Sequence, residues 1–144
     1  MHVDERQLEG LIIDSGVISQ GAMGKLKSAA QEKKVSLGNM AVMQGVLRGE
    51  DLRRMEAYLL GVPFVDLKNR KIDFALFSLV PEPVARNHNV VAFGQEGEGL
   101  EVALLNIADL AAVSFLRKKG LKLLPRLTDD ESMKHALVSY QHSL

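Results

Sequence analysis

The segment from Gly16 to Ser28, GVISQGAMGKLKS, contains the residue types with which a P-loop binds nucleotide phosphates. A P-loop requires a glycine, four further residues and then Gly-Lys-Ser/Thr, because backbone N–H groups surround the phosphates and the hydroxyl binds Mg²⁺. Here Gly24-Lys25 is followed by Leu26, which cannot ligate a metal, and Ser19 stands where the first glycine belongs. The residues before this segment have helical periodicity and not the pattern of a buried strand. The spacing therefore predicts that this segment is not a P-loop.

Histidines and carboxylates are the other groups that commonly do chemistry. His135 and His142 are seven residues apart and fit one helix face, but no third or fourth metal ligand is evident, which favours a surface pair. His88 precedes an expected strand and is interpreted as part of a polar turn. The acids 129–131 are interpreted as favourable charges at a helix N-terminus, which carries partial positive charge. We therefore predict no catalytic residue, no metal site and no enzymatic activity.

One basic cluster is recognised from the sequence, formed by Lys25, Lys27, Lys33 and Lys34. It is open to two interpretations, a binding surface for an anion or acidic partner and a solvated helix face. The solvated face is favoured, because runs of like charge on a helix are usually exposed to water.

Composition limits the classes of protein to which the chain can belong. The 144 residues are 47% apolar and 25% charged, with 18 basic and 18 acidic residues, typical of a globular protein without the strong basic field of many nucleic-acid binders. No cysteine is present, which fits a reducing compartment and excludes disulfides and thiolate metal sites. Neither a signal peptide nor a membrane-spanning run is recognised. We expect a cytoplasmic protein that neither binds nucleic acid nor inserts into a membrane.

A degenerate repeat accounts for two of the glycines. Residues 8–23, LEGLIIDSGVISQGAM, align with residues 37–52, LGNMAVMQGVLRGEDL, and Gly16 coincides with Gly45. Each copy predicts a helix, a turn at the glycine and a second helix, because glycine adopts the left-handed conformation that ends many helices. Ser19 is expected to cap its helix, whereas Arg48, at the equivalent position, predicts a weaker cap. The second unit is expected to end at Gly61.

The second half of the chain predicts a mixture of helices and strands. Short helices are expected over 72–79 and 81–86, and a further helix over 108–118 that ends at Gly120. Strands are expected over 89–93, 100–105 and 121–126, the first two joined as a hairpin through a loop of medium length. Pro125 implies either that the third strand ends there or that it lies at an edge. A capping box from Thr128 to Glu131 is expected to start a last helix. The predicted fold class is α+β, with a helical subdomain of two helix-turn-helix repeats (residues 1–61) followed by a small three-stranded α+β subdomain (residues 62–144).

Several segments together resemble the N-terminal domain of type II secretion and type IV pilus assembly ATPases. They are the repeat, GVPFVDL (61–67), KIDFALFSLVPEPVARNHNVVAF (71–93) and LEVALLNIADL (100–110). The resemblance extends from Leu8 to Tyr140 and implies a non-catalytic docking or regulatory domain that binds a partner protein. The implied partner is the cytoplasmic domain of an inner-membrane platform protein, or a motor ATPase.

MshE-type members of that family imply an alternative, the binding of cyclic di-GMP by two tandem repeats that begin Arg-Leu-Gly. The positions that match this motif are Leu8, Leu37 and Gly38, whereas Gln7 and Ser36 replace both arginines. Charged hydrogen bonds contribute roughly 1.5–3 kcal/mol each, so these losses disfavour the ligand. We therefore expect no cofactor.

Overall fold

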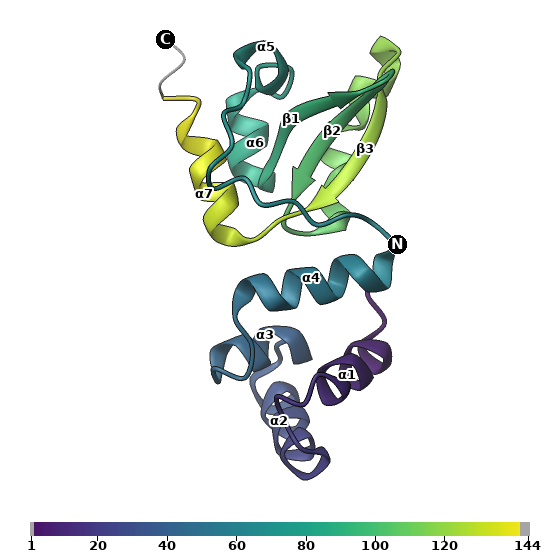
Figure 1. The fold of residues 1–144 in the computed structure, drawn as a ribbon, viewed down its shortest axis with the longest axis vertical. Helices are drawn as coiled ribbons and strands as arrows, with labels where there is room; N and C mark the ends of the chain where they lie inside the picture. Colours follow the sequence, from purple (N-terminus) through teal and green to yellow (C-terminus); the bar gives the residue numbers. More distant parts are fainter. Residues whose placement is uncertain (1, 142–144) are drawn as a thin grey trace.

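The computed structural model describes residues 2–141, whose helices and strands form two stacked parts (Figure 1). The lower part contains α1 (Glu5–Asp14), α2 (Gln20–Lys33), α3 (Leu37–Met43) and α4 (Gly49–Leu60). The upper part contains α5 (Phe74–Phe77), α6 (Glu82–His88), β1 (Val90–Glu96), β2 (Gly99–Leu104), the 3₁₀ helix η1 (Ile107–Lys119), β3 (Lys122–Leu127) and α7 (Asp130–Val138). The predicted α+β class is confirmed.

The two helix-turn-helix units are present as the repeat predicts. Gly16 follows α1 with φ 81°, and Gly45 follows α3 with φ 74°. At these angles a Cβ would crowd the backbone, so glycine allows the chain to leave each helix without strain. Gly61 ends α4 in the same way, with φ 71°.

The starts of the second helices differ between the two units, also as expected. The Ser19 hydroxyl accepts a hydrogen bond from the Ala22 N–H at 3.1 Å. The guanidinium of Arg48 can only donate, and Asp51 of the first turn instead accepts from the Arg48 backbone N–H at 3.2 Å. Asp51 also forms an ion pair with the Arg48 side chain. The hydrogen bond that the Arg48 guanidinium donates in this pair lowers the pKa of the Asp51 carboxyl. The α4 start therefore relies on the carboxylate of its own first turn.

Helix α4 contributes to both hydrophobic cores. Leu52 belongs to the lower core and Ala57 to the upper one. The lower core is built from these buried residues: Leu8, Ile12, Met23, Leu26, Ala30, Leu37, Met40, Ala41, Leu47 and Leu52. In Figure 1, α4 accordingly lies between the lower helices and the sheet. The division of the chain after residue 61 stays a prediction.

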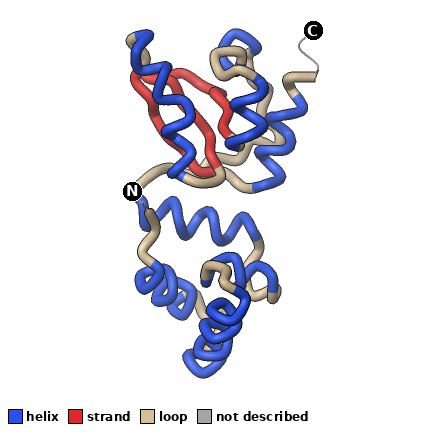
Figure 2. Tube along the Cα trace, turned by 180° about the vertical axis from the view of Figure 1, so that it is seen from behind, coloured by secondary structure: helices blue, strands red, loops and turns tan. Residues whose placement is uncertain are grey.

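The upper core lies around the sheet, whose strand order is β1-β2-β3 within residues 2–141. Strand β1 is antiparallel to β2, and β3 is parallel to it, with η1 as the crossover segment across one face of the sheet (Figure 2). The placement of β3 at an edge is confirmed. Part of that edge is covered, since the Val65 N–H donates to the Leu127 carbonyl at 2.9 Å.

The hairpin loop is shorter than the sequence suggests. The strands continue to Glu96 and from Gly99, leaving a turn at Gly97 and Glu98. Gly94, expected in the loop, lies inside β1 next to a bulge, where an added Cβ would be 2.5 Å from Glu101 Oε1. The expectation of a medium loop was wrong, because a glycine required by close packing resembles a turn glycine in sequence.

Two helix predictions of the upper part also need correction. Thr128 does not cap α7: its hydroxyl donates to the Val65 carbonyl at 2.6 Å, and Asp129 caps the helix by accepting from the Ser132 N–H at 2.7 Å. The tertiary contact with residue 65 takes the hydroxyl away from the helix. The helix expected over 72–79 is limited to α5, and the next one, α6, extends to residue 88.

The helix expected over 108–118 is present as η1 and ends at Gly120, whose φ is 83°. It is a 3₁₀ helix, a type that apolar spacing alone does not distinguish from an α-helix.

Candidate functional site

The glycine and lysine segment that resembles a P-loop forms ordinary helix. Helix α1 precedes it where a P-loop would follow a strand, and Lys25 is an exposed residue of α2. The four lysines recognised from the sequence are all exposed, and Lys27 pairs with Glu9 at 3.2 Å. The solvated interpretation of this cluster agrees with their positions.

The histidines and acids lie apart from one another. His88 is the last residue of α6, and its Nδ1 is 3.2 Å from Asp109 Oδ1. His135 is exposed on α7, while His142, its expected neighbour, lies outside the described residues. Within residues 2–141, no three His, Asp or Glu side chains are grouped so that they could hold a metal ion. In the same range, no helix is long and apolar enough to cross a bilayer.

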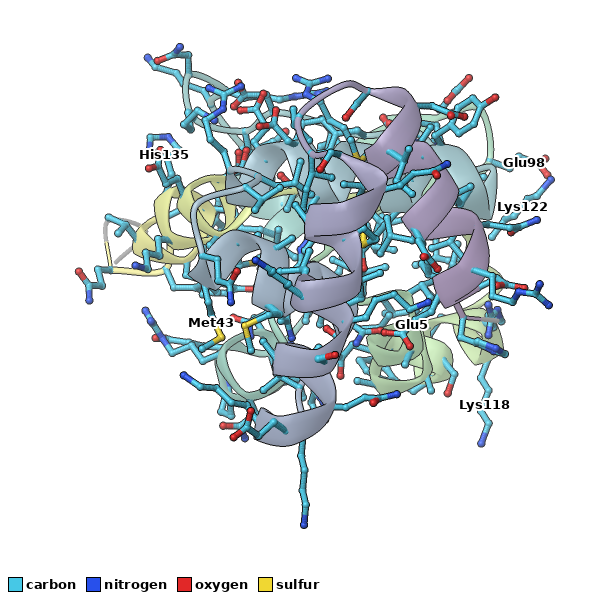
Figure 3. The ribbon with its side chains drawn as sticks, turned by 90° about the horizontal axis from the view of Figure 1, so that it is seen from below. Glu5, Met43, Glu98, Lys118, Lys122 and His135 are labelled. Atoms are coloured by element: carbon cyan, nitrogen blue, oxygen red, sulfur yellow. The ribbon has the colours of Figure 1, made fainter. Side chains whose placement is uncertain are left out.

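The residues that match the cyclic di-GMP motif meet where α1, α3 and α4 cross. Leu8, Leu37 and Gly38 are all buried. A Cβ on Gly38 would be 2.6 Å from Leu52 Cδ1 and 3.4 Å from Leu8 Cδ2, so the glycine allows the three helices to approach closely. The Leu37 N–H donates to Glu5 Oε1 at 2.9 Å, so this carboxylate occupies the N–H at the start of α3. Figure 3 labels Glu5, the first residue of α1, in a view from below.

A cavity of about 350 Å³ lies at the junction of the two parts, lined by α1, α3 and α4 of the lower part and by residues in and next to the sheet. We call it the junction cavity. Its lining residues are His2, Val3, Glu5, Leu8, Ser36, Gly38, Asn39, Arg53, Glu56, Leu60, Leu105, Asn106, Ile107 and Leu127. Arg53 Nη1 forms an ion pair with Glu56 Oε1 at 2.7 Å, while its buried Nε has no hydrogen-bond partner within residues 2–141. The cavity wall therefore contains one unsatisfied guanidinium donor.

A cluster of charges joins α4 to the upper part of the molecule. Lys68 Nζ lies 3.2 Å from Asp129 Oδ2, 3.4 Å from Glu50 Oε1 and 3.4 Å from Asp66 Oδ1. The hydrogen bond to Asp129, whose side chain is 5% exposed, raises the pKa of the lysine. The Lys68 backbone N–H donates to Asp66 and lowers the pKa of that carboxyl. These groups are occupied with one another, as expected of a structural ion-pair network.

Sequence reasoning missed the charged residues of this network and of the junction cavity. Arg53 and Glu56 stand three apart on one helix and signal a pair, but only the fold brings them to a cavity. A third omission is the run RKKGLK, with Arg117, Lys118, Lys119 and Lys122, which a simple count of neighbouring charges identifies.

Comparison with known proteins defines the family. Residues 60–144, more than half of the chain, match the MshEN domain. The chain belongs to the MshEN domain family.

This MshEN domain is also similar to one part of a much longer protein, the type IV pilus assembly ATPase PilB of Myxococcus xanthus (strain DK1622). The two are 25% identical over 135 residues, which are 93% of this chain and 24% of PilB. The chain thus spans about a quarter of the length of this relative.

Two solved structures share the fold of the domain. The structure of MshE with cdg superposes with a TM-score of 0.76 and 23% identity, covering 92% of this chain and 97% of that one. The N-terminal domain of XpsE superposes with a TM-score of 0.65 and 17% identity, covering 95% of each chain. The MshEN domain therefore has the fold of these two structures, one of which is an N-terminal domain. The resemblance inferred from the sequence is confirmed.

Proposed function

We propose that this MshEN domain is a non-catalytic docking and regulatory module that binds a partner protein of a secretion or pilus machinery. The observation that carries the proposal is its likeness, over nearly the whole chain, to the N-terminal domain of XpsE and to part of a pilus ATPase. The expected partner is the cytoplasmic domain of an inner-membrane platform protein, with a motor ATPase as the other candidate. The proposal implies a cytoplasmic location.

The polar groups of the domain support a binding role over a catalytic one. Asp129 and Asp51 serve helix starts, Lys68 joins three carboxylates, and His88 contacts Asp109. A catalytic site requires a nucleophile or general base held close to a reacting atom in a pocket. The groups named here have structural partners instead.

Binding to the purified cytoplasmic domain of the platform protein encoded with this chain tests the proposal. Calorimetry should give a saturable one-to-one signal in the micromolar range or tighter, and the platform domain of an unrelated system serves as the control. Absence of a signal for both the platform domain and the cognate motor domain refutes the proposal.

Cyclic di-GMP binding is a second candidate, favoured by the likeness to MshE with cdg and by the unsatisfied Arg53 donor at the junction cavity. Three features oppose it. Both motif arginines are replaced, the Glu5 carboxylate accepts from the Leu37 N–H, and leucine side chains cover Gly38. An added phosphate would lie near Glu5, where like charges repel.

Calorimetry with cyclic di-GMP distinguishes the two candidates. We expect no measurable heat at millimolar ligand for the wild type. Binding that is lost in Arg53→Ala would replace the docking proposal with a sensor function at the junction cavity. The exposed Arg6→Ala variant is the matched control, since it removes an arginine of the same helical part.

A further inference from the structure

Four cations lie within six positions where η1 ends and β3 begins, and we name them the basic rim: Arg117, Lys118, Lys119 and Lys122. All four side chains are exposed. None of them forms an ion pair within residues 2–141, although seven other lysines and arginines do. The basic rim is therefore a local concentration of positive charge on a chain with no net charge.

The backbone of the basic rim is firmly held. Leu116, before it, is fully buried, and Leu123, after it, is 8% exposed. Between them Gly120 turns the chain with φ 83°, and Lys122 pairs with Gly99 in the parallel register of β2 and β3. The four charges are thus presented from a fixed base, which lowers the entropy cost of binding.

The dipole of η1 favours three cations of the basic rim, since Arg117, Lys118 and Lys119 lie in its last turn, but it does not account for the fourth. A helix C-terminus attracts positive charge, but this effect is limited to the last turn. Lys122 lies beyond Gly120 and belongs to a strand. Figure 3 shows Lys118 directed away from the ribbon, and Lys122 on the same side of the molecule. Neighbouring like charges without counter-charges repel, so their grouping favours a function outside the folded chain.

The charges next to the basic rim indicate which kind of partner fits. Lys122 shares a shallow hollow with Glu96 and Glu98 of the hairpin, and Figure 3 shows Glu98 beside it. A flat anionic bilayer that contacts the lysines would also meet these two exposed carboxylates. A single-stranded nucleic acid would normally be stacked on aromatic side chains, and the run RKKGLK contains none. The surface of a partner protein, in contrast, can place acidic side chains opposite the basic rim and a basic side chain opposite the two hairpin carboxylates.

We propose that the basic rim is the surface with which this domain binds an acidic face of its partner protein. The inference rests on the proposed docking function and adds the location of the interface and the charge of the partner. Complementary charges of this kind accelerate association and make binding sensitive to salt.

Two triple charge reversals with equal change in net charge test the inference. The first is Arg117→Glu, Lys118→Glu and Lys119→Glu. The control is Lys25→Glu, Lys33→Glu and Lys34→Glu, three exposed residues of α2 and of its C-terminal cap. Each purified full-length chain is titrated with the platform cytoplasmic domain at low and high salt, after melting curves have shown that both variants are folded.

We expect the rim variant to bind on the order of 100-fold more weakly, because like charges then meet across the interface, and the control to stay within about threefold of wild type. The salt dependence should also reverse, because added salt screens the attraction in the wild type and the repulsion in the rim variant. Equal binding by wild type and rim variant, or a larger loss in the control, overturns the inference and leaves the docking function intact. A wild type that binds neither platform nor motor domain refutes both.

Vesicles of phosphatidylglycerol and phosphatidylethanolamine test the competing lipid explanation. In a flotation assay, we expect the wild type to remain at the bottom of the gradient, separate from the floating vesicles. Flotation of the wild type that the rim variant loses, together with unchanged protein binding, would assign the basic rim to a membrane and overturn the inference.

Discussion

Substitution of the turn glycine Gly45 provides a quantitative test of how the helical repeat is built. Its φ of 74° lies in the left-handed region, and a Cβ added there would meet no atom within 4 Å other than those of its own residue and its two chain neighbours. The cost of Gly45→Ala is therefore a backbone cost, about 1–2 kcal/mol for an L-residue in this conformation. Gly45→Val should lose more, because a β-branched residue resists positive φ further.

Gly24→Ala is a matched control, for which the expected change in the free energy of unfolding has the opposite sign. Gly24 lies inside α2, and an added Cβ there also meets nothing within 4 Å. Alanine is favoured over glycine in a helix by about 1 kcal/mol, so Gly24→Ala should stabilise the protein. Two chemically identical substitutions, neither with new contacts, should thus differ by about 2–3 kcal/mol.

Urea unfolding followed by circular dichroism measures both free energies of unfolding on the same scale. The slope m should be unchanged, so that the shift in midpoint reports stability. Gly45→Asn should recover part of the loss, because asparagine tolerates the left-handed region. A Gly45→Ala variant as stable as wild type would refute the assignment of Gly45 as an obligatory turn residue, and a Gly24→Ala variant that is less stable would contradict the expected gain in helix propensity within α2.

Three further predictions concern contacts within the upper part and its joint with α4. Tyr140→Phe should lower stability by about 1–2 kcal/mol in urea unfolding, since the buried hydroxyl hydrogen-bonds to the carbonyls of Phe77 and Val80 at 3.0 and 2.8 Å. Burial raises the pKa of Tyr140 from 10.0 to about 12. The folded state therefore keeps a proton that the unfolded state loses, and wild-type stability should fall from pH 10 to 12 more steeply than that of Tyr140→Phe. Lys68→Met should destabilise the protein in urea unfolding by leaving the buried Asp129 carboxylate without its cation, and unchanged stability would contradict the proposed network.

Local features of the fold were accessible from the sequence because neighbouring residues decide them. The left-handed turns at Gly16 and Gly45 and the Ser19 cap depend on groups only a few residues apart. Helix α1 was likewise predicted from apolar residues at helical spacing. The family resemblance followed from such features in their correct order, and the match over residues 60–144 agrees with it.

Features that depend on distant partners were predicted incorrectly or missed. Thr128 has the sequence of a capping residue, but the Val65 carbonyl, 63 residues away, binds its hydroxyl. Gly94 has the sequence of a turn, but its approach to Glu101 across the hairpin explains the glycine. In both cases, the competing partner is brought close only by the sheet.

The candidate site shows the same division. The sequence alone determined that the segment at Lys25 lacks P-loop spacing and that Leu8, Leu37 and Gly38 occupy motif positions without the motif arginines. Only the tertiary structure decided that Gly38 allows close helix packing and that Glu5 occupies the Leu37 N–H. Periodicity, capping and turns follow from short-range sterics and hydrogen bonds. Burial and charge pairing arise only when the folded chain brings distant residues within contact distance.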